Sequence, residues 1–131
     1  MNKLWKTVKP SGRKVVKANA TYTGGGIYQY TGQLDNGHWF QTWTDWEDYV
    51  QELDADPELN WDESGYEDWQ TEHTAVTHTK DAAMDITRQA MDWILRKSPV
   101  GNYSVSEIKD ARADLDDYLA HVRECGRYDN Y

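Results

Sequence analysis

The side chains of this sequence that could do chemistry are mainly carboxylates, and they are concentrated in one stretch. Residues 18 to 79 contain thirteen Asp and Glu and no Lys or Arg, and twelve of the thirteen lie between positions 45 and 72. Tryptophan and tyrosine residues are interleaved with them. A field of one sign repels itself and costs stability, while aromatic side chains often anchor binding hot spots. A surface kept for solubility would mix both signs, so the pattern favours a binding surface for a basic partner.

The carboxylate spacing resembles a calcium loop at one point. Asp54, Asp56 and Glu58 alternate along the chain. An EF-hand loop that begins at Asp54 needs Gly at its sixth position and Glu at its twelfth. Those positions hold Leu59 and Gly65, so a solvated acidic loop is the better interpretation.

Patterns typical of zinc sites or of nucleophilic catalysis are missing from the sequence. His73 and His78 are five residues apart, which is not the i, i+4 spacing of a helical zinc pair. Cys125, the single cysteine, is expected near a helix C-terminus, where the helix dipole raises the pKa of a thiol. We therefore predict no catalytic residue, no metal and no cofactor, and a protein that is not an enzyme.

The acidic stretch lies between two segments of different charge. Residues 1 to 17 contain six basic residues and no acidic one, and residues 80 to 131 contain eight basic and ten acidic residues. With a net charge of −9, the chain is a poor candidate for general nucleic-acid binding, which needs basic contacts to phosphate. The basic N-terminal segment is the exception, and it could instead neutralise part of the protein's own acidic face.

The cysteine count and the lack of secretory or membrane-spanning patterns point to the cytosol. A lone cysteine cannot form an internal disulfide, which favours a reducing compartment. The first residues are basic but are not followed by the apolar stretch of a secretory signal. No apolar run approaches the length of a membrane span, so we predict a cytoplasmic protein.

The first third of the chain has the pattern of β-strands. Residues 4 to 8, 14 to 23, 27 to 34 and 38 to 42 are rich in β-branched and aromatic residues and are separated by turn residues. The Asp35-Asn36-Gly37 segment predicts a hairpin whose Asn-Gly pair takes positive φ at both turn positions.

Two short helices are predicted in the acidic segment. Thr44 and Glu47 form a capping box that would open a helix to about Leu53, whose apolar residues recur at helical spacing: Trp46, Tyr49, Val50 and Leu53. Ser64 and Glu67 form a second box before a helix over residues 65 to 73. Residues 74 to 79 are β-branched and would be a linker or a short added strand.

The C-terminal part predicts an antiparallel helical hairpin. Apolar residues recur at helical spacing over residues 80 to 97, and Ser98-Pro99 ends this helix. Ser104 and Glu107 form a third capping box, and Ile108, Ala111, Leu115, Leu119 and Val122 line one face of a last helix that Gly126 would cap.

The predicted fold is α+β and forms a single domain over residues 1–131. Residues 1–43 would be mainly β and residues 44–131 mainly α. An N-terminal antiparallel sheet of three to four strands would pack on the C-terminal helices.

In length, charge segregation and absence of catalytic motifs, the chain resembles small acidic inhibitors from phages and mobile elements. These include anti-CRISPR and anti-restriction proteins that mimic DNA. The segments WEDY at 46 to 49 and YEDW at 66 to 69 illustrate the charge segregation. The resemblance is one of properties and includes no shared sequence motif, so no functional residue is carried over from it. It implies a non-enzymatic inhibitor that binds a basic, nucleic-acid-binding host effector. The expected partner-binding residues are Asp45, Glu47, Asp48, Glu52, Asp54, Asp56, Trp61, Asp62, Glu63, Tyr66, Glu67, Asp68 and Trp69.

Two other functions remain compatible with the sequence. The same acidic face could serve an adaptor or assembly protein of a mobile element that binds a basic protein partner. A small enzyme with an unrecognised carboxylate site is the weaker alternative, since it would need a deep pocket with convergent polar groups.

Overall fold

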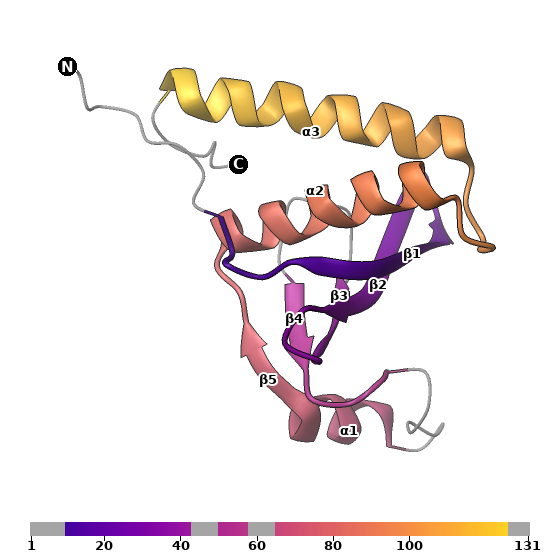
Figure 1. The fold of residues 1–131 in the computed structure, drawn as a ribbon, viewed down its shortest axis with the longest axis vertical. Coiled ribbons are helices and arrows are strands. Elements are labelled where there is room, and N and C mark those ends of the chain that lie inside the picture. Colours follow the sequence, from indigo (N-terminus) through magenta and orange to yellow (C-terminus); the bar gives the residue numbers. More distant parts are fainter. Residues whose placement is uncertain (1–9, 43–49, 58–64, 126–131) are drawn as a thin grey trace.

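The computed structural model describes residues 10–42, 50–57 and 65–125, which form an antiparallel sheet and three helices (Figure 1). The strands and helices, in chain order, are β1 (Val15–Gly24), β2 (Ile27–Leu34), β3 (Trp39–Thr42), β4 (Val50–Leu53), α1 (Tyr66–His73), β5 (Thr74–Thr77), α2 (Lys80–Lys97) and α3 (Val105–Cys125). The α+β prediction, with an N-terminal antiparallel sheet and C-terminal helices, is confirmed.

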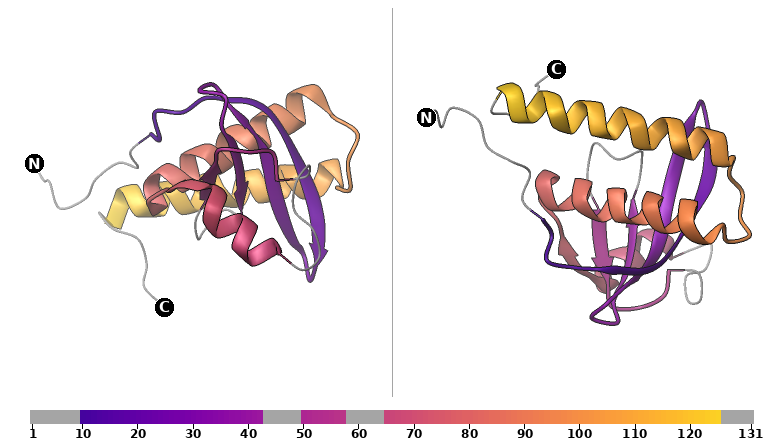
Figure 2. Two further views of the ribbon diagram at one scale, coloured as in Figure 1. Left: turned by 90° about the horizontal axis from the view of Figure 1, so that it is seen from below. Right: turned by 45° about the horizontal axis from the view of Figure 1, so that its top comes forward.

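The elements stack in layers. The five strands follow one another in the order β1-β2-β3-β4-β5, and each neighbouring pair is antiparallel. Helix α2 crosses one face of this sheet, and α3 runs antiparallel to α2 on its far side (Figures 1 and 2). Helix α1 lies on the other side of the sheet, where Gln70 Nε2 donates a hydrogen bond to Gln51 Oε1 at 2.5 Å. The predicted helical hairpin is therefore present, and it covers only one face of the sheet.

The core lies between the sheet and α2. In β2, the alternate residues Tyr28, Tyr30 and Leu34 are buried, which is the period-2 pattern of a strand with one covered face. Gly32 continues this row. A Cβ placed there would lie 2.1 Å from the Lys17 carbonyl oxygen and 2.7 Å from the Phe40 ring. Glycine is needed at this position because the neighbouring strand and ring already fill the space.

The hairpin between β2 and β3 forms where predicted, but with a different turn. Leu34 N–H donates to the His38 carbonyl and Gly37 N–H donates to the Leu34 carbonyl. Among the described non-glycine residues Ser98 alone has positive φ, so Asn36 does not, whereas Gly37 has φ of 88°. The prediction of positive φ at both turn positions was wrong. A three-residue loop closes the hairpin and needs the left-handed conformation at its last residue alone.

The helix predicted to end near Leu53 is wrong over its last four residues. Residues Val50–Leu53 form strand β4, which pairs with β3 on one side and β5 on the other. The predicted start of that helix, and the predicted strand over residues 4 to 8, lie outside the described residues. Local spacing suggested a helix, but hydrogen bonding to two neighbouring strands decided the conformation.

The first turn of α3 uses only half of its predicted capping box. Glu107 N–H donates to Ser104 Oγ at 3.4 Å, as predicted. The Glu107 carboxylate instead accepts a 2.5 Å hydrogen bond from the Tyr28 hydroxyl, which also accepts from Ser104 N–H at 3.1 Å. A tyrosine of β2 thus joins the sheet to the helix start. At α1 the N-cap is Gly65, with no side-chain capping bond, and Ser64 lies outside the described residues.

Candidate functional site

Three of the four carboxylates that the structure describes as exposed between residues 18 and 79 gather around α1, and the fourth, Asp35, lies in the β2–β3 turn. Asp68 and Glu72 are exposed and one helical turn apart on this helix. Asp54, which follows β4, reaches the C-terminal end of α1, where its Oδ1 lies 2.6 Å from His73 Nδ1. We call Asp54, Asp68 and Glu72 the α1-side acidic surface.

Part of this surface works against the stability of the helix itself. Like charges at i, i+4 destabilise a helix, and a carboxylate near a helix C-terminus opposes the helix dipole. Of the three carboxylates, Asp54 has a basic neighbour in His73. Asp68, by contrast, is the third residue of α1, where the helix dipole favours a carboxylate.

Much of the predicted partner-binding set lies outside the described residues, namely Asp45, Glu47, Asp48, Trp61, Asp62 and Glu63. Tyr66 and Glu67 lie in the first turn of α1. Trp69 is 7% exposed and packs on His73, with ring centroids 4.8 Å apart. The Trp69 side chain therefore supports α1 from inside rather than presenting its ring on the surface.

Glu52 differs most from the expectation, because it is fully buried. Its carboxylate accepts hydrogen bonds from four side chains of this chain: Arg13 Nε at 3.0 Å, Asn36 Nδ2 at 2.8 Å, His78 Nε2 at 2.9 Å and His38 Nδ1. Arg13 belongs to the basic N-terminal stretch, so that stretch neutralises one carboxylate of the acidic segment inside the fold.

The pKa of Glu52 reflects two opposing causes. Burial raises the pKa of a carboxyl, because it penalises the charged form. The hydrogen bonds from Asn36, His38, Arg13 and His78 favour that form and outweigh burial, so the pKa falls to about 2. Glu52 is therefore ionised at neutral pH and holds together the segment before β1, the β2–β3 hairpin, β4 and the residue after β5.

A second buried carboxylate, Asp85 of α2, serves the same purpose at the N-terminal side of β1. Asp85 Oδ2 accepts hydrogen bonds from Ser11 N–H at 3.0 Å and Ser11 Oγ at 2.9 Å, and Oδ1 accepts from Arg88 at 2.6 Å. Both buried carboxylates are occupied by groups of the protein itself, so we assign them structural roles.

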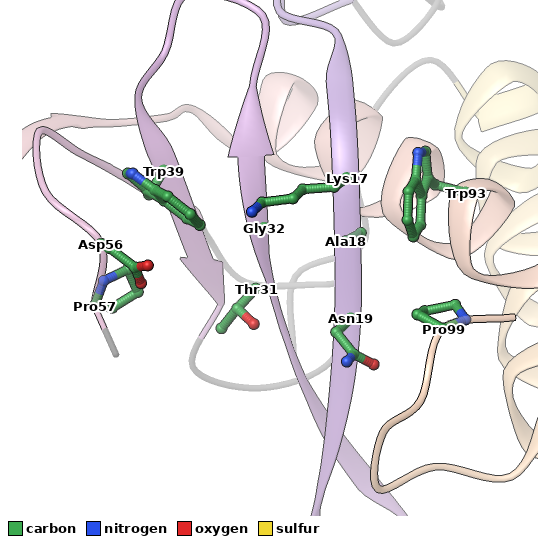
Figure 3. Close-up of a pocket in the computed structure, with 10 residues that line it drawn as sticks. All are labelled: Lys17, Ala18, Asn19, Thr31, Gly32, Trp39, Asp56, Pro57, Trp93 and Pro99. Atoms are coloured by element: carbon green, nitrogen blue, oxygen red, sulfur yellow. The ribbon is translucent and has the colours of Figure 1, made fainter. Parts of the chain in front are cut away.

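A pocket of about 270 Å³ crosses β1, β2 and β3 (Figure 3). Lys17, Thr31 and Trp39 line it from the strands, and Asp56 and Pro57 from the segment after β4. The strand register places Lys17 and Trp39 on the sheet face opposite α2, because their neighbours along the chain belong to the covered face. The Lys17 ammonium lies 4.6 Å from the centre of the Trp39 ring, which is a cation–π contact.

Two features of the structure were not predicted from the sequence. The pocket was missed because its walls come from segments far apart in the chain. The second is a row of exposed carboxylates on α3, formed by Asp110, Asp114 and Asp117. Their spacing of four and three residues places them on one face of a helix. Basic and acidic residues are nearly balanced over residues 80 to 131, so the charge of this part of the chain gave no signal. Lys109 and Arg112 lie among them.

Across residues 10–42, 50–57 and 65–125, no group of three His, Cys, Asp or Glu side chains is arranged to hold a metal ion. In those ranges, no helix is both long and apolar enough to cross a membrane.

Comparisons with models of protein families, with curated proteins and with solved structures found no match to this chain.

Proposed function

We propose that this protein is a non-enzymatic inhibitor that binds a basic, nucleic-acid-binding protein through the α1-side acidic surface. The observation that carries the proposal is the charge segregation: 62 consecutive residues, 18 to 79, hold thirteen carboxylates and no Lys or Arg. In the described part of that stretch, Asp54, Asp68 and Glu72 are exposed around α1.

Electrostatics explains why such a surface suits a nucleic-acid-binding partner. Duplex DNA presents about one negative charge per 1.7 Å of its axis, and a groove that binds it is lined with Lys and Arg. Carboxylates spaced about one helical turn apart, roughly 6 Å, supply a related though sparser line of charge. Complementary charge increases the association rate and makes binding sensitive to salt.

The row on α3 provides a matched comparison within the same chain. Asp110, Asp114 and Asp117 also number three, but basic residues lie among them, and α3 lies on the opposite side of the molecule from α1 (Figure 1). A single groove that holds α1 does not reach α3. The proposal therefore assigns binding to the α1 side and no contact to α3.

The test compares two triple variants in a pull-down from host lysate at low and moderate salt, with mass spectrometry of the retained proteins. Asp54→Asn/Asp68→Asn/Glu72→Gln and Asp110→Asn/Asp114→Asn/Asp117→Asn remove the same net charge. We expect the first to lose a nucleic-acid-binding protein that the wild type and the second retain, and we expect DNA to displace that protein.

Other outcomes separate the remaining interpretations. Equal weakening by both variants would mean that net charge alone attracts the retained protein, and would overturn a specific surface. A partner that DNA does not displace would favour the adaptor or assembly function.

A further inference from the structure

The pocket already contains a cation, and that cation belongs to the protein. The Lys17 ammonium lies over the Trp39 ring at 4.6 Å from its centre. Lys17 is exposed. Trp39 is half-buried and lies in β3, which pairs with β2 on one side and β4 on the other. The aromatic face is therefore fixed in position, and the cation that occupies it is not.

The Lys17 contact is easily displaced for two reasons. A cation–π contact at an exposed site is weak. Among the described residues Lys17 forms no ion pair that would hold its ammonium over the ring. Lys17 therefore leaves the ring at little cost when a better cation arrives.

The side chains around Trp39 suit one kind of cation in particular. Asp56 and Pro57 lie at the Trp39 end of the pocket (Figure 3), so a carboxylate stands beside an aromatic face. A guanidinium is planar, stacks on an aromatic ring and pairs with a carboxylate through two parallel N–H groups. An ammonium, such as that of Lys17, is not planar, so it cannot lie flat on a ring or pair with a carboxylate through two parallel N–H groups.

We propose that this pocket binds an arginine side chain of the basic partner, and that Lys17 occupies the site as a stand-in when no partner is bound. Trp39 stacks on the guanidinium, and Asp56 accepts its N–H groups. The partner as the source of that arginine rests on the proposed function, whereas the affinity of the pocket for a guanidinium does not. The pocket supplies a specific anchor, and the α1-side acidic surface supplies long-range attraction.

The experiment titrates the free protein with the peptide acetyl-Gly-Arg-Gly-amide and follows the indole N–H signals by NMR, with the Trp39 signal assigned by comparison with Trp39→Phe. The control peptide contains citrulline, which has nearly the same shape but no charge. We expect a shift of the Trp39 signal with millimolar affinity for the arginine peptide, since the ligand is small and exposed, and no saturation with citrulline.

Two substitutions of Lys17 should move this affinity in opposite directions. Lys17→Met vacates the ring and should strengthen binding about two- to five-fold, which is the strength of one exposed cation–π contact. Lys17→Arg supplies an internal guanidinium and should weaken binding. Lys14→Met is the matched control: Lys14 is also exposed and near the start of β1, so its loss removes the same charge without vacating Trp39.

A third variant tests the carboxylate. Asp56→Asn should weaken binding of the arginine peptide by about three-fold or more, because it removes the charged acceptor.

The inference is overturned if arginine and citrulline peptides bind alike, if Trp39 does not respond, or if Lys17→Met and Lys14→Met change the affinity equally. None of these results would affect capture of a basic protein through Asp54, Asp68 and Glu72, so failure here is distinguishable from failure of the proposed function.

Discussion

Glu52 and Glu72 come from the same acidic stretch of sequence, yet they end in opposite environments. Glu52 is fully buried and accepts hydrogen bonds from four side chains, including Arg13 of the basic N-terminal stretch. Glu72 is exposed on α1, one turn from another carboxylate. The comparison teaches that the sequence charge of a segment does not measure the charge it offers to a partner. One part of it neutralises the protein's own basic groups, and the rest remains exposed.

The largest expected effect comes from removing the buried charge. Glu52→Gln should destabilise the protein by about 3–5 kcal/mol, because it removes the buried negative charge and replaces one of the two acceptor oxygens with an NH₂ donor that faces other donors. Urea unfolding followed by tryptophan fluorescence measures the change. Glu72→Gln is the matched control and should change the free energy of unfolding by less than about 0.5 kcal/mol. Similar losses of unfolding free energy for the two variants would show that Glu52 contributes no more to stability than Glu72.

The second effect is a pH dependence that belongs to Glu52. Its pKa is lowered from 4.5 to about 2 in the folded state, so its contribution to stability is complete above the unfolded value and is lost as pH falls from about 4.5 toward 2. The contribution amounts to about 3 kcal/mol. Unfolding free energies of wild type and Glu52→Gln, measured from pH 6 down to pH 2, should therefore converge. A constant difference across this range would contradict the assignment.

A smaller effect is expected at Glu107, an exposed carboxylate that accepts a hydrogen bond from the buried Tyr28 side chain. The Tyr28 hydroxyl donates to Glu107, and burial, followed by this hydrogen bond, raises the tyrosine pKa. Tyr28→Phe should cost about 1–2 kcal/mol, because it also removes the acceptor of Ser104 N–H. Thermal unfolding measures the loss. Combining Tyr28→Phe with Glu107→Gln should cost less than the sum of the single changes, and additive losses would show that the pair is not coupled.

The smallest effect on stability is expected at the exposed carboxylates. The α1-side triple variant Asp54→Asn/Asp68→Asn/Glu72→Gln should leave the unfolding free energy nearly unchanged, because relief of the like-charge pair on α1 offsets the loss of the exposed Asp54–His73 pair. The same variant is expected to lose the partner in the pull-down. A folded variant that still captures the partner would show that the exposed charges of this segment are not the binding surface.

Patterns local in the chain predicted much of the fold. The strand over residues 27 to 34, the helical stripe of residues 80 to 97 and the apolar face of the last helix all appear in the structure. These predictions succeed because side-chain periodicity reflects which face of an element is covered. The same logic failed at Val50–Leu53, where strand pairing on both sides, which involves residues far away in the chain, outweighed a helical spacing.

For the candidate site, the sequence by itself determined the amount and sign of charge, and hence the expectation of a basic partner. Only the tertiary structure decided that Glu52 and Trp69 lie inside, that Asp54 joins Asp68 and Glu72 around α1, and that Trp39, Lys17 and Asp56 meet in one pocket. The physical reason is that charge and periodicity are properties of neighbouring residues. Burial, hydrogen bonding of a carboxylate and the walls of a pocket depend instead on contacts between segments that the chain brings together when it folds.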